Sequence, residues 1–240
     1  MKKLILALLI LAGTVHAQSL IVISGSKTVS AAPTASFISG GSCQNNGTNC
    51  TSTIAHAGDA IAGCASWSVS GTPASISVSD GTNSFTILTH VSDTQNDWVQ
   101  CFYLLNETLT GSTTFTVTFP GGASSLGVWE AEFHATSGTW HYDTSNQAGQ
   151  HNTTASNSGT ITSHGSTGEI IVNEASLANT AATYGSPAIG GNTPTEMPFS
   201  PVNTYTHDYY LLNTSVSSGA TGTYSTNTDW TNSVVALYAQ

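Results

Sequence analysis

The chain contains almost no basic side chains. Its 240 residues include three lysines and no arginine, against thirteen aspartates and glutamates, and Lys27 is the only base after residue 17. Nucleic acids and anionic membrane surfaces are bound through lysine and arginine, so both are excluded as partners. Bidentate capture of carboxylate or phosphate substrates is excluded for the same reason. The remaining surface of Ser, Thr, Asn and Gly suits sugars, cations or other proteins.

Helical patterns are also nearly absent, because no apolar stripe recurs at the 3.6-residue spacing of a helix. Short runs rich in Val, Ile, Thr, Phe, Tyr and Trp alternate instead with Gly, Ser, Asn and Asp clusters, which is typical of strands and turns. The expected strands are residues 20–24, 60–69, 75–79, 84–90, 98–106, 113–119, 126–134, 159–162, 169–177, 206–213, 221–226 and 233–238. The pattern predicts an all-β fold, an antiparallel β-sandwich of jelly-roll or immunoglobulin-like type.

Two segments between these strands have distinct patterns. Residues 80–83 read Asp-Gly-Thr-Asn and predict a tight hairpin turn. Residues 136–158 are polar and are expected to form a long connection.

The N-terminus has the pattern of a secretory signal peptide. Lys2 and Lys3 precede an apolar run over residues 4–11, and Val15-His16-Ala17 forms a small-residue cleavage site. The run is too short for a membrane span, which needs about 20 apolar residues. We expect cleavage after Ala17, giving an exported protein without a membrane span. One base and thirteen acids then remain, a formal charge of −12.

Four cysteines fit an oxidising compartment, and their even number allows three complete pairings. Pairing Cys43 with Cys50 closes a short turn, and pairing Cys64 with Cys101 joins two predicted strands. The second bridge would contribute about 4 kcal/mol through chain entropy. Zinc binding is the competing interpretation, but the chain lacks the C-x-x-C spacing of such sites.

The sequence also contains an internal repeat. Residues 58–61 resemble residues 168–171, and the Phe-Tyr-Leu-Leu-Asn of residues 102–106 matches the Tyr-Tyr-Leu-Leu-Asn of residues 209–213. Two matching blocks in the same order predict a duplication. We expect residues 18–52 to form an N-terminal strand and a Cys-bearing loop, ahead of one sandwich domain over residues 53–240. Its related halves would span about 53–135 and 159–240; two separate small domains are the alternative.

Several of these motifs resemble a known group of proteins. They are the Asp80-x-x-Asn83-x-Phe85-Thr86 turn, the Tyr-x-x-Asn strands and the Glu-Phe-x-Ala strand end that finishes at Ala135. Together they are similar to secreted bacterial β-sandwich proteins, jelly-roll or immunoglobulin-like, that have no assigned activity. The resemblance covers about residues 55–240. It implies the fold and gives no information on chemistry.

One predicted strand carries a candidate site. Glu130, Glu132 and His134 alternate with apolar residues, so all three lie on one face, about 6.6 Å apart. Two carboxyl groups could serve a jelly-roll glycan hydrolase or lyase. The three residues could also bind a metal, with His141 or Asp143 as further ligands. A solvated polar face on a half-buried strand is the alternative.

The duplication predicts a second site. It maps Cys64 onto Glu174 and Cys101 onto Asp208, so these carboxylates should be neighbours if the cysteines are bonded. Without a nearby base, the pair would bind a cation such as Ca²⁺, or one acid would keep its proton. Two unrelated surface acids are the alternative.

Three aromatic residues are candidate ligand contacts. Trp140 and Tyr142 lie in the polar connection, and Trp98 follows Asn96-Asp97 at a strand start. Exposed Trp and Tyr side chains bind sugar rings and protein surfaces. Trp67 and Trp129 lie in apolar alternation and are expected in the core.

The motifs of common hydrolases are missing, since neither Gly-x-Ser-x-Gly nor H-E-x-x-H occurs. The first hypothesis is therefore a secreted non-enzymatic module without a cofactor, for adhesion, surface assembly or glycan contact. Its partners would be a glycan or a protein surface. Self-association is a variant, in which the N-terminal strand at residues 19–24 completes a neighbour's sheet edge. The alternative hypothesis is a glycan-active hydrolase or lyase that uses Glu130 and Glu132.

Overall fold

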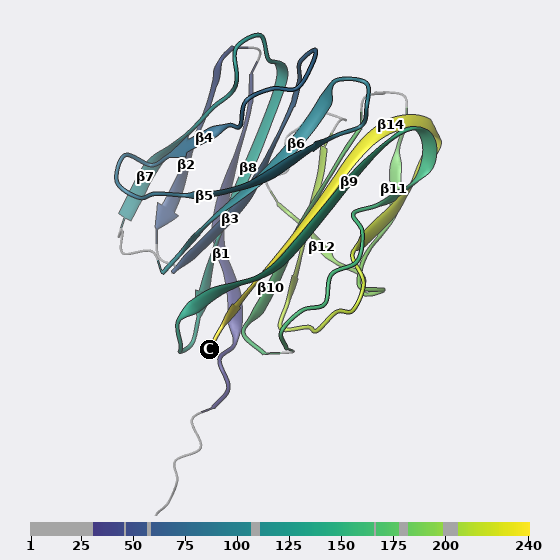
Figure 1. Ribbon diagram of the computed structural model, residues 1–240. Helices are drawn as coiled ribbons and strands as arrows, with labels where there is room; N and C mark the ends of the chain where they lie inside the picture. The colour runs from purple at the N-terminus through teal and green to yellow at the C-terminus, as the bar shows by residue number, and fades with distance from the viewer. Residues whose placement is uncertain are drawn as a thin grey trace, which may run out of the picture. The chain divides into compact units, whose positions relative to one another are not determined.

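A computed structural model describes residues 31–45, 47–56, 59–106, 111–165, 167–177, 182–198 and 206–240. Every regular element in this part of the chain is a β-strand (Figure 1). The strands are β1 (Ala35–Asn45), β2 (Asn49–His56), β3 (Ala60–Ser68), β4 (Ser77–Ser79), β5 (Thr86–Ser92), β6 (Asp97–Leu105), β7 (Gly111–Thr118), β8 (Ser124–Ala135), β9 (Trp140–Asn157), β10 (Glu169–Leu177), β11 (Tyr184–Ile189), β12 (Thr195–Glu196), β13 (Thr206–Leu212) and β14 (Ala220–Ala239). Among the described residues there is no helix that could cross a membrane. The predicted signal peptide and the predicted strand at residues 20–24 lie outside the described residues.

The strands form three antiparallel sheets. Sheet A has the order β1-β8-β3-β6-β5, and sheet B has the order β2-β7-β4. Sheet C has the order β11-β14-β10-β13-β12, with β9 also paired to β14. The predicted all-β sandwich is therefore confirmed.

The inner strands β3 and β8 of sheet A are buried on both faces. Ala62 and Cys64 of β3 pack in one apolar cluster with Val172 of sheet C. Trp67, on the opposite face of β3, packs with Phe115 of sheet B. Successive strand residues point to opposite faces, so a strand covered on both sides must be apolar throughout. This requirement explains the continuous Ala-Ile-Ala-Gly-Cys-Ala start of β3.

The strand pairing repeats in register between the two halves. β3 lies between β6 and β8, and β10 lies between β13 and β14 in the same arrangement. Ala62 pairs with Tyr103 as Val172 pairs with Tyr210, as the sequence repeat requires. The register of these strand pairs therefore agrees with the predicted repeat residue by residue.

The edge strands extend this repeat. β1 starts its ladder at Ala35 opposite Ala135 of β8, and β9 starts at Trp140 opposite Ala239 of β14. The register of each ladder then shifts by one residue at the equivalent place. The shift occurs because β1 has one additional residue, Ile38, and β9 has one additional residue, Asp143. A repeated bulge shows that β1 and the beginning of β9 are copies of one strand. The pairing therefore makes β1 part of the first half and β9 part of the second, so both halves begin earlier than the sequence suggested.

The prediction of a polar connection over residues 136–158 was wrong. Most of this segment is β9, an 18-residue strand that runs along β14 (Figure 1). Its Asn, Gln, His and Gly residues have low strand propensity, but the ladder to β14 holds most of them extended. β14 is likewise one continuous strand where two short ones were expected, and residues 159–162 form no strand.

The two halves contact each other reciprocally. Tyr103 of the first half stacks on Tyr142 of the second, with ring centroids 5.2 Å apart. Tyr210 of the second half stacks on Phe37 of the first, with centroids 5.4 Å apart. Since Tyr103 is equivalent to Tyr210 and Phe37 to Tyr142, the interface between the halves has the self-complementary form of a two-fold dimer.

Both predicted disulfides are present. Cys43–Cys50 joins β1 to β2, and Cys64–Cys101 joins residues directly opposite each other on β3 and β6. Two disulfides are consistent with an extracellular protein.

The turn at residues 80–83 is tight, as expected. Asp80 Oδ1 accepts hydrogen bonds from the backbone N–H groups of Thr82 and Asn83, at 2.8 and 2.7 Å. The flanking strands belong to different sheets, however, because β4 pairs with β7 and β5 with β6. The prediction of a hairpin at this point was therefore wrong.

Candidate functional site

The predicted catalytic carboxylates are inaccessible. Glu130 and Glu132 are both 0% exposed. Glu130 Oε1 accepts a hydrogen bond from Ser52 of β2, and Glu132 Oε2 accepts one from Ser39 of β1 at 3.0 Å. The expectation of a solvated face or an open groove was wrong, because it placed β1 and β2 outside the sandwich. A polysaccharide chain cannot reach either carboxyl group.

Glu130 is an unusual core residue. Burial raises its pKa to about 8, and the hydrogen bond from Ser52 offsets only part of this effect. Its second oxygen, Oε2, is buried without a hydrogen-bond partner among the described residues. Space for the carboxyl group depends on Gly41, where an added Cβ would lie 2.7 Å from Oε1. Glu130 is therefore protonated and uncharged at neutral pH.

The other residues predicted to bind a metal together with Glu130 do not lie around its carboxyl group. His134 is exposed at the end of β8, where its Nδ1 lies 2.9 Å from Asp59 Oδ1. His141 stacks on Tyr238, and Asp143 accepts a hydrogen bond from the backbone N–H of His164. In the part of the chain that the structure describes, no three His, Cys, Asp or Glu side chains are placed to hold a metal ion.

Glu174 and Asp208 are neighbours, as the duplication predicts. They are register partners on β10 and β13, just as Cys64 and Cys101 are on β3 and β6. Both acids are 0% exposed, so the alternative of two surface acids was wrong. Burial raises the pKa of Glu174 to about 7.

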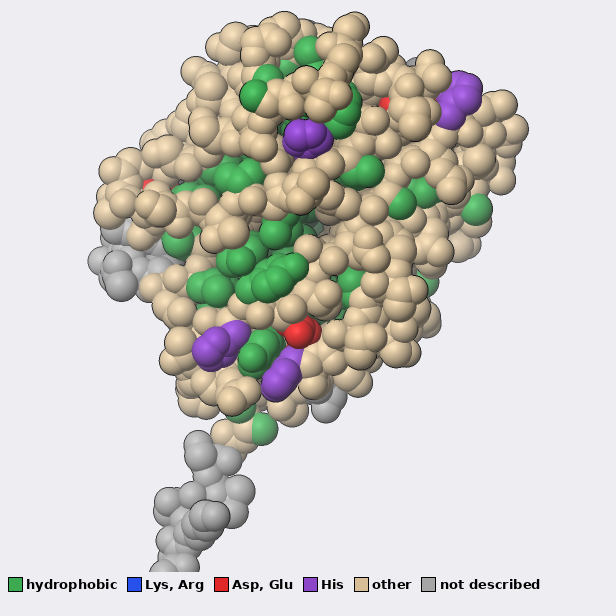
Figure 2. Space-filling view, in the orientation of Figure 1, with side chains coloured by type: hydrophobic (Ala, Val, Ile, Leu, Met, Phe, Trp, Pro, Cys, Tyr) green, Lys and Arg blue, Asp and Glu red, His purple; other side chains and the backbone are tan. Residues whose placement is uncertain are grey.

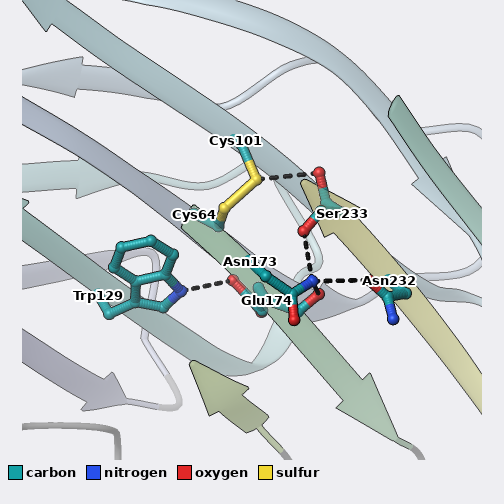
Figure 3. Close-up of a disulfide and its surroundings, with 7 residues drawn as sticks. All are labelled: Cys64, Cys101, Trp129, Asn173, Glu174, Asn232 and Ser233. Atoms are coloured by element: carbon teal, nitrogen blue, oxygen red, sulfur yellow. Dashed lines mark hydrogen bonds between the residues drawn. A yellow bond between two sulfur atoms is a disulfide. The ribbon is translucent and has the colours of Figure 1, made fainter. Parts of the chain in front are cut away.

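Glu174 of this pair faces the region of the Cys64–Cys101 disulfide across the interface of the two halves (Figure 3). The indole N–H of Trp129 donates to Glu174 Oε2 at 3.1 Å. Ser233, the register partner of Glu174 on β14, lies with its Oγ 3.1 Å from Cys101 Sγ. Because Trp129 is the register partner of Cys64 on β8, equivalent positions of the two halves meet here.

The predicted ligand-binding aromatics differ in exposure. Trp140 is only 1% exposed and belongs to the core shared by the halves, so its prediction as a surface contact was wrong. It is buried because β9 is a strand and not a loop. Tyr142 is 37% exposed, although one ring face is covered by Tyr103. Trp67 and Trp129 are buried, as expected.

Trp98 lies beside a polar depression. It is half-buried, and its indole N–H donates to the carbonyl oxygen of Val69 at 3.2 Å. The depression has a volume of about 300 Å³ and forms where the end of β3 meets the starts of β6 and β8. Its lining residues are Ser68, Val69, Ser70, Gln95, Asn96, Asp97, Gly122 and Ser124.

The loop before β6 is held by a buried carboxylate. Asp93 is 0% exposed, and its Oδ1 accepts hydrogen bonds from the N–H groups of Gln95 and Asp97 at 2.6 and 3.2 Å. Asn96 has a φ of 92°, so its backbone is fixed in the left-handed region. Sequence reasoning found only the Asn96-Asp97-Trp98 part of this site. The serines come from segments about 25 to 30 residues away, and nothing in their local pattern separates them from other surface serines.

The chain matches no protein-family model, no curated protein and no solved structure.

Proposed function

We propose that the chain is a secreted, non-catalytic β-sandwich module that contacts neutral glycans on an extracellular surface through the depression beside Trp98. The lining of the depression carries this proposal. Serine hydroxyls, the amides of Gln95 and Asn96 and a single carboxylate, Asp97, converge in it. Hydroxyl, amide and carboxylate groups are the hydrogen-bonding partners that sugar hydroxyls require.

The charge of the surface supports a neutral ligand. The described residues include no lysine or arginine, and uncharged side chains cover most of the face in Figure 2. An anionic polysaccharide would find no lysine or arginine to pair with among the described residues and would be repelled by the acidic chain. Binding of a neutral glycan should therefore depend only weakly on ionic strength.

The burial of Glu130 and Glu132 favours binding over hydrolysis. A glycosidase needs a carboxyl pair that flanks the bond to be cleaved. In this chain both carboxyl groups are fully buried and bonded to serines of β1 and β2. The depression itself offers one carboxylate, Asp97, which accepts a hydrogen bond from Ser68. This donor set supports recognition and does not support a two-carboxylate mechanism.

Export and adhesion belong to the same proposal. Residues 1–17 have the composition of a signal peptide, and the two disulfides fit an oxidising compartment. A duplicated sandwich with two disulfides and few ion pairs is suited to an outer surface, where ionic strength varies.

A glycan array followed by titration calorimetry with neutral oligosaccharides tests the proposal. The variant Gln95→Ala with Asn96→Gly removes two lining amides, and glycine keeps the left-handed backbone of residue 96. We expect at least a tenfold loss of affinity, which is about 1.4 kcal/mol. The matched control is Gln44→Ala, which removes an exposed amide of β1 outside the depression.

Two outcomes would contradict the proposal. One is the absence of binding to any neutral glycan. The other is polysaccharide turnover that Glu130→Gln or Glu132→Gln abolishes, which would favour the hydrolase or lyase instead.

A further inference from the structure

We propose that the depression beside Trp98 takes a single neutral sugar unit at the end of a glycan chain, and that Asp97 recognises this unit by accepting two neighbouring hydroxyl groups of its ring. This inference rests on the proposed glycan contact and narrows it from neutral glycans in general to their terminal units.

The polar groups of the depression meet at one end of sheet A. Ser68, the last residue of β3, is the register partner of Asp97 on β6 and of Ser124 on β8. Residues directly opposite each other on neighbouring strands project from the same face, so these three side chains form one polar row. The register between β3 and β8 shifts just before this row, between Ser66 and Ser68. Such irregularities redirect side chains and are frequent next to functional sites.

The size of the depression is that of a site for one sugar ring. Its volume is about 300 Å³, at the lower end of the range of about 300–1,000 Å³ that is typical of small-molecule sites. Its eight lining residues come from three short segments, at the end of β3 and at the starts of β6 and β8. A site for internal units of a polysaccharide would need lining residues that continue past the bound ring on both sides.

Recognition in the depression depends on hydrogen bonds and not on stacking. None of the described residues that line it is aromatic. Trp98 lies beside it, with its indole N–H bonded to Val69 and its ring edge-on to His90, at a centroid distance of 5.1 Å. Aromatic side chains offer a flat apolar surface to the faces of sugar rings. Their absence from the lining therefore disfavours an extended chain that lies across the site.

Asp97 is the only charged residue of the lining. Its carboxylate has about four acceptor positions, and the hydroxyl group of Ser68 occupies one of them at Oδ1. The remaining positions match two hydroxyls on adjacent ring carbons, because a carboxylate accepts two parallel donors at once. The other hydroxyl and amide groups of the lining are exposed and can pair with the rest of the ring; they belong to Ser70, Gln95, Asn96 and Ser124.

The two sides of the depression are fixed to each other before a ligand binds. The carbonyl oxygen of Asn96 accepts a hydrogen bond from the N–H of Val69 at 2.9 Å, which links the loop before β6 to the end of β3. The N–H of Asp93 donates to the carbonyl oxygen of Asp97 at 3.1 Å and closes the loop. A preformed arrangement of donors and acceptors distinguishes sugars by the orientation of their hydroxyls.

Saturation-transfer NMR tests the proposal on the full mature chain with both disulfides intact. The probes are the methyl glycosides of glucose, galactose and mannose, their deoxy analogues, and linear oligosaccharides of the same sugars with increasing length. We expect saturation to reach only the terminal ring, and the methyl glycoside of that sugar to bind as tightly as its longer chains. Loss of either of two adjacent hydroxyls should lower the affinity about tenfold or more.

The outcomes separate this inference from the function on which it rests. Saturation of several successive rings, or an affinity that rises with each added unit, would overturn the terminal-unit inference and leave the glycan contact standing. Binding of none of these probes or of any other neutral glycan would overturn both.

A matched pair of glycine variants tests the location. Gly122 has a φ of 84°, and a Cβ added there would meet only Val69, at 3.8 Å. Asparagine tolerates this left-handed conformation, so Gly122→Asn fills the depression without straining the fold. Gly81→Asn is the control, because Gly81 has a φ of 87° and open space around it, in a turn outside the depression. We expect Gly122→Asn to lower the affinity about tenfold or more and Gly81→Asn to leave it unchanged. Equal effects of the two variants would contradict the location.

The role of Asp97 has its own variant. Asp97→Asn keeps the size of the side chain and removes one acceptor oxygen and the charge. It should weaken binding of the intact sugar about tenfold and bring its affinity close to that of the deoxy analogues. An unchanged preference for the intact sugar over its deoxy analogues would overturn the assignment to Asp97.

Discussion

Asn106 binds the backbone of Trp140 through both ends of its side-chain amide. Its Oδ1 accepts from the N–H of Trp140 at 2.8 Å, and its Nδ2 donates to the carbonyl oxygen at 3.1 Å. Asn213 binds Ala35 in the same way, with both distances at 2.8 Å. Each asparagine thus binds the backbone of the first strand residue of the opposite half, Trp140 of β9 or Ala35 of β1. The repeated Tyr-x-x-Asn motif is the docking element of the duplicated fold, because its tyrosine stacks on the other half and its asparagine binds the other half's backbone.

The first prediction concerns these two asparagines. Replacing either one with glycine keeps the positive φ of 55° or 52° but removes two hydrogen bonds between the halves. We expect each change to lower the free energy of unfolding by about 1–3 kcal/mol, because two partly buried backbone groups lose their partners. Denaturation in urea measures the effect. The control is Asn192→Gly, which removes an amide that donates to the carbonyl oxygens of Ile189 and Gly190 in its own turn. Losses no larger than that of the control would refute the docking role.

The parts of the fold that the sequence predicted share a physical cause. β3, β6, β8, β10 and β13 are covered on both faces or hold the repeated motif, so apolar runs and the duplication both identify them. The neighbouring positions of Glu174 and Asp208 followed from the same repeat, although each acid alone looks like a surface residue. Here a long-range relationship could be read from the sequence because an equivalent pair of cysteines marked it.

What the sequence did not predict depends on tertiary pairing. β9 is polar and glycine-containing, and only its ladder to β14 makes it a strand. The burial of Trp140 follows from that strand. The burial of Glu130 depends on Gly41 and Ser52, which lie in β1 and β2, where Ser, Gly and Asn obscure the strand pattern. Edge strands rich in small polar residues carry little local signal. The sequence therefore did not predict that β1 and β2 cover the face of β8 that carries Glu130 and Glu132.

The second prediction uses the equivalence between the acid pair and the disulfide. Glu174→Cys combined with Asp208→Cys should form a disulfide spontaneously in the secreted chain, because these positions share the register of Cys64 and Cys101. The bridge should add about 3–4 kcal/mol to the stability through chain entropy. Mass spectrometry of the unreduced protein detects the bond.

The control for this pair lies one residue away. Asn173→Cys with Asp208→Cys places the two thiols on opposite faces of sheet C, so no bond should form. A bridge in this control, or none in the predicted pair, would show that the register of the repeat does not govern the geometry.

The third prediction concerns Glu130 and the pH dependence of stability. Its equivalent in the second half is Val234, since Gly63 pairs with Glu130 as Asn173 pairs with Val234. The pKa of Glu130 is about 8 in the folded chain, against an ordinary value of 4.5. Between these values the folded chain binds a proton that the unfolded chain has released. This group therefore lowers the stability as the pH rises, by about 1.4 kcal/mol per pH unit across the interval.

Glu130→Gln should remove this contribution, because glutamine has nearly the same shape, accepts the hydrogen bond from Ser52 and cannot ionise. Its stability relative to the wild type should rise steadily from acidic pH to pH 8 and level off above it. Urea denaturation at a series of pH values measures this difference. Asp59→Asn is the control, because Asp59 is partly exposed beside His134. A stability difference between Glu130→Gln and the wild type that stays constant with pH would mean that Glu130 is charged in its buried site, and the structural account of its neutral carboxyl group would then be wrong.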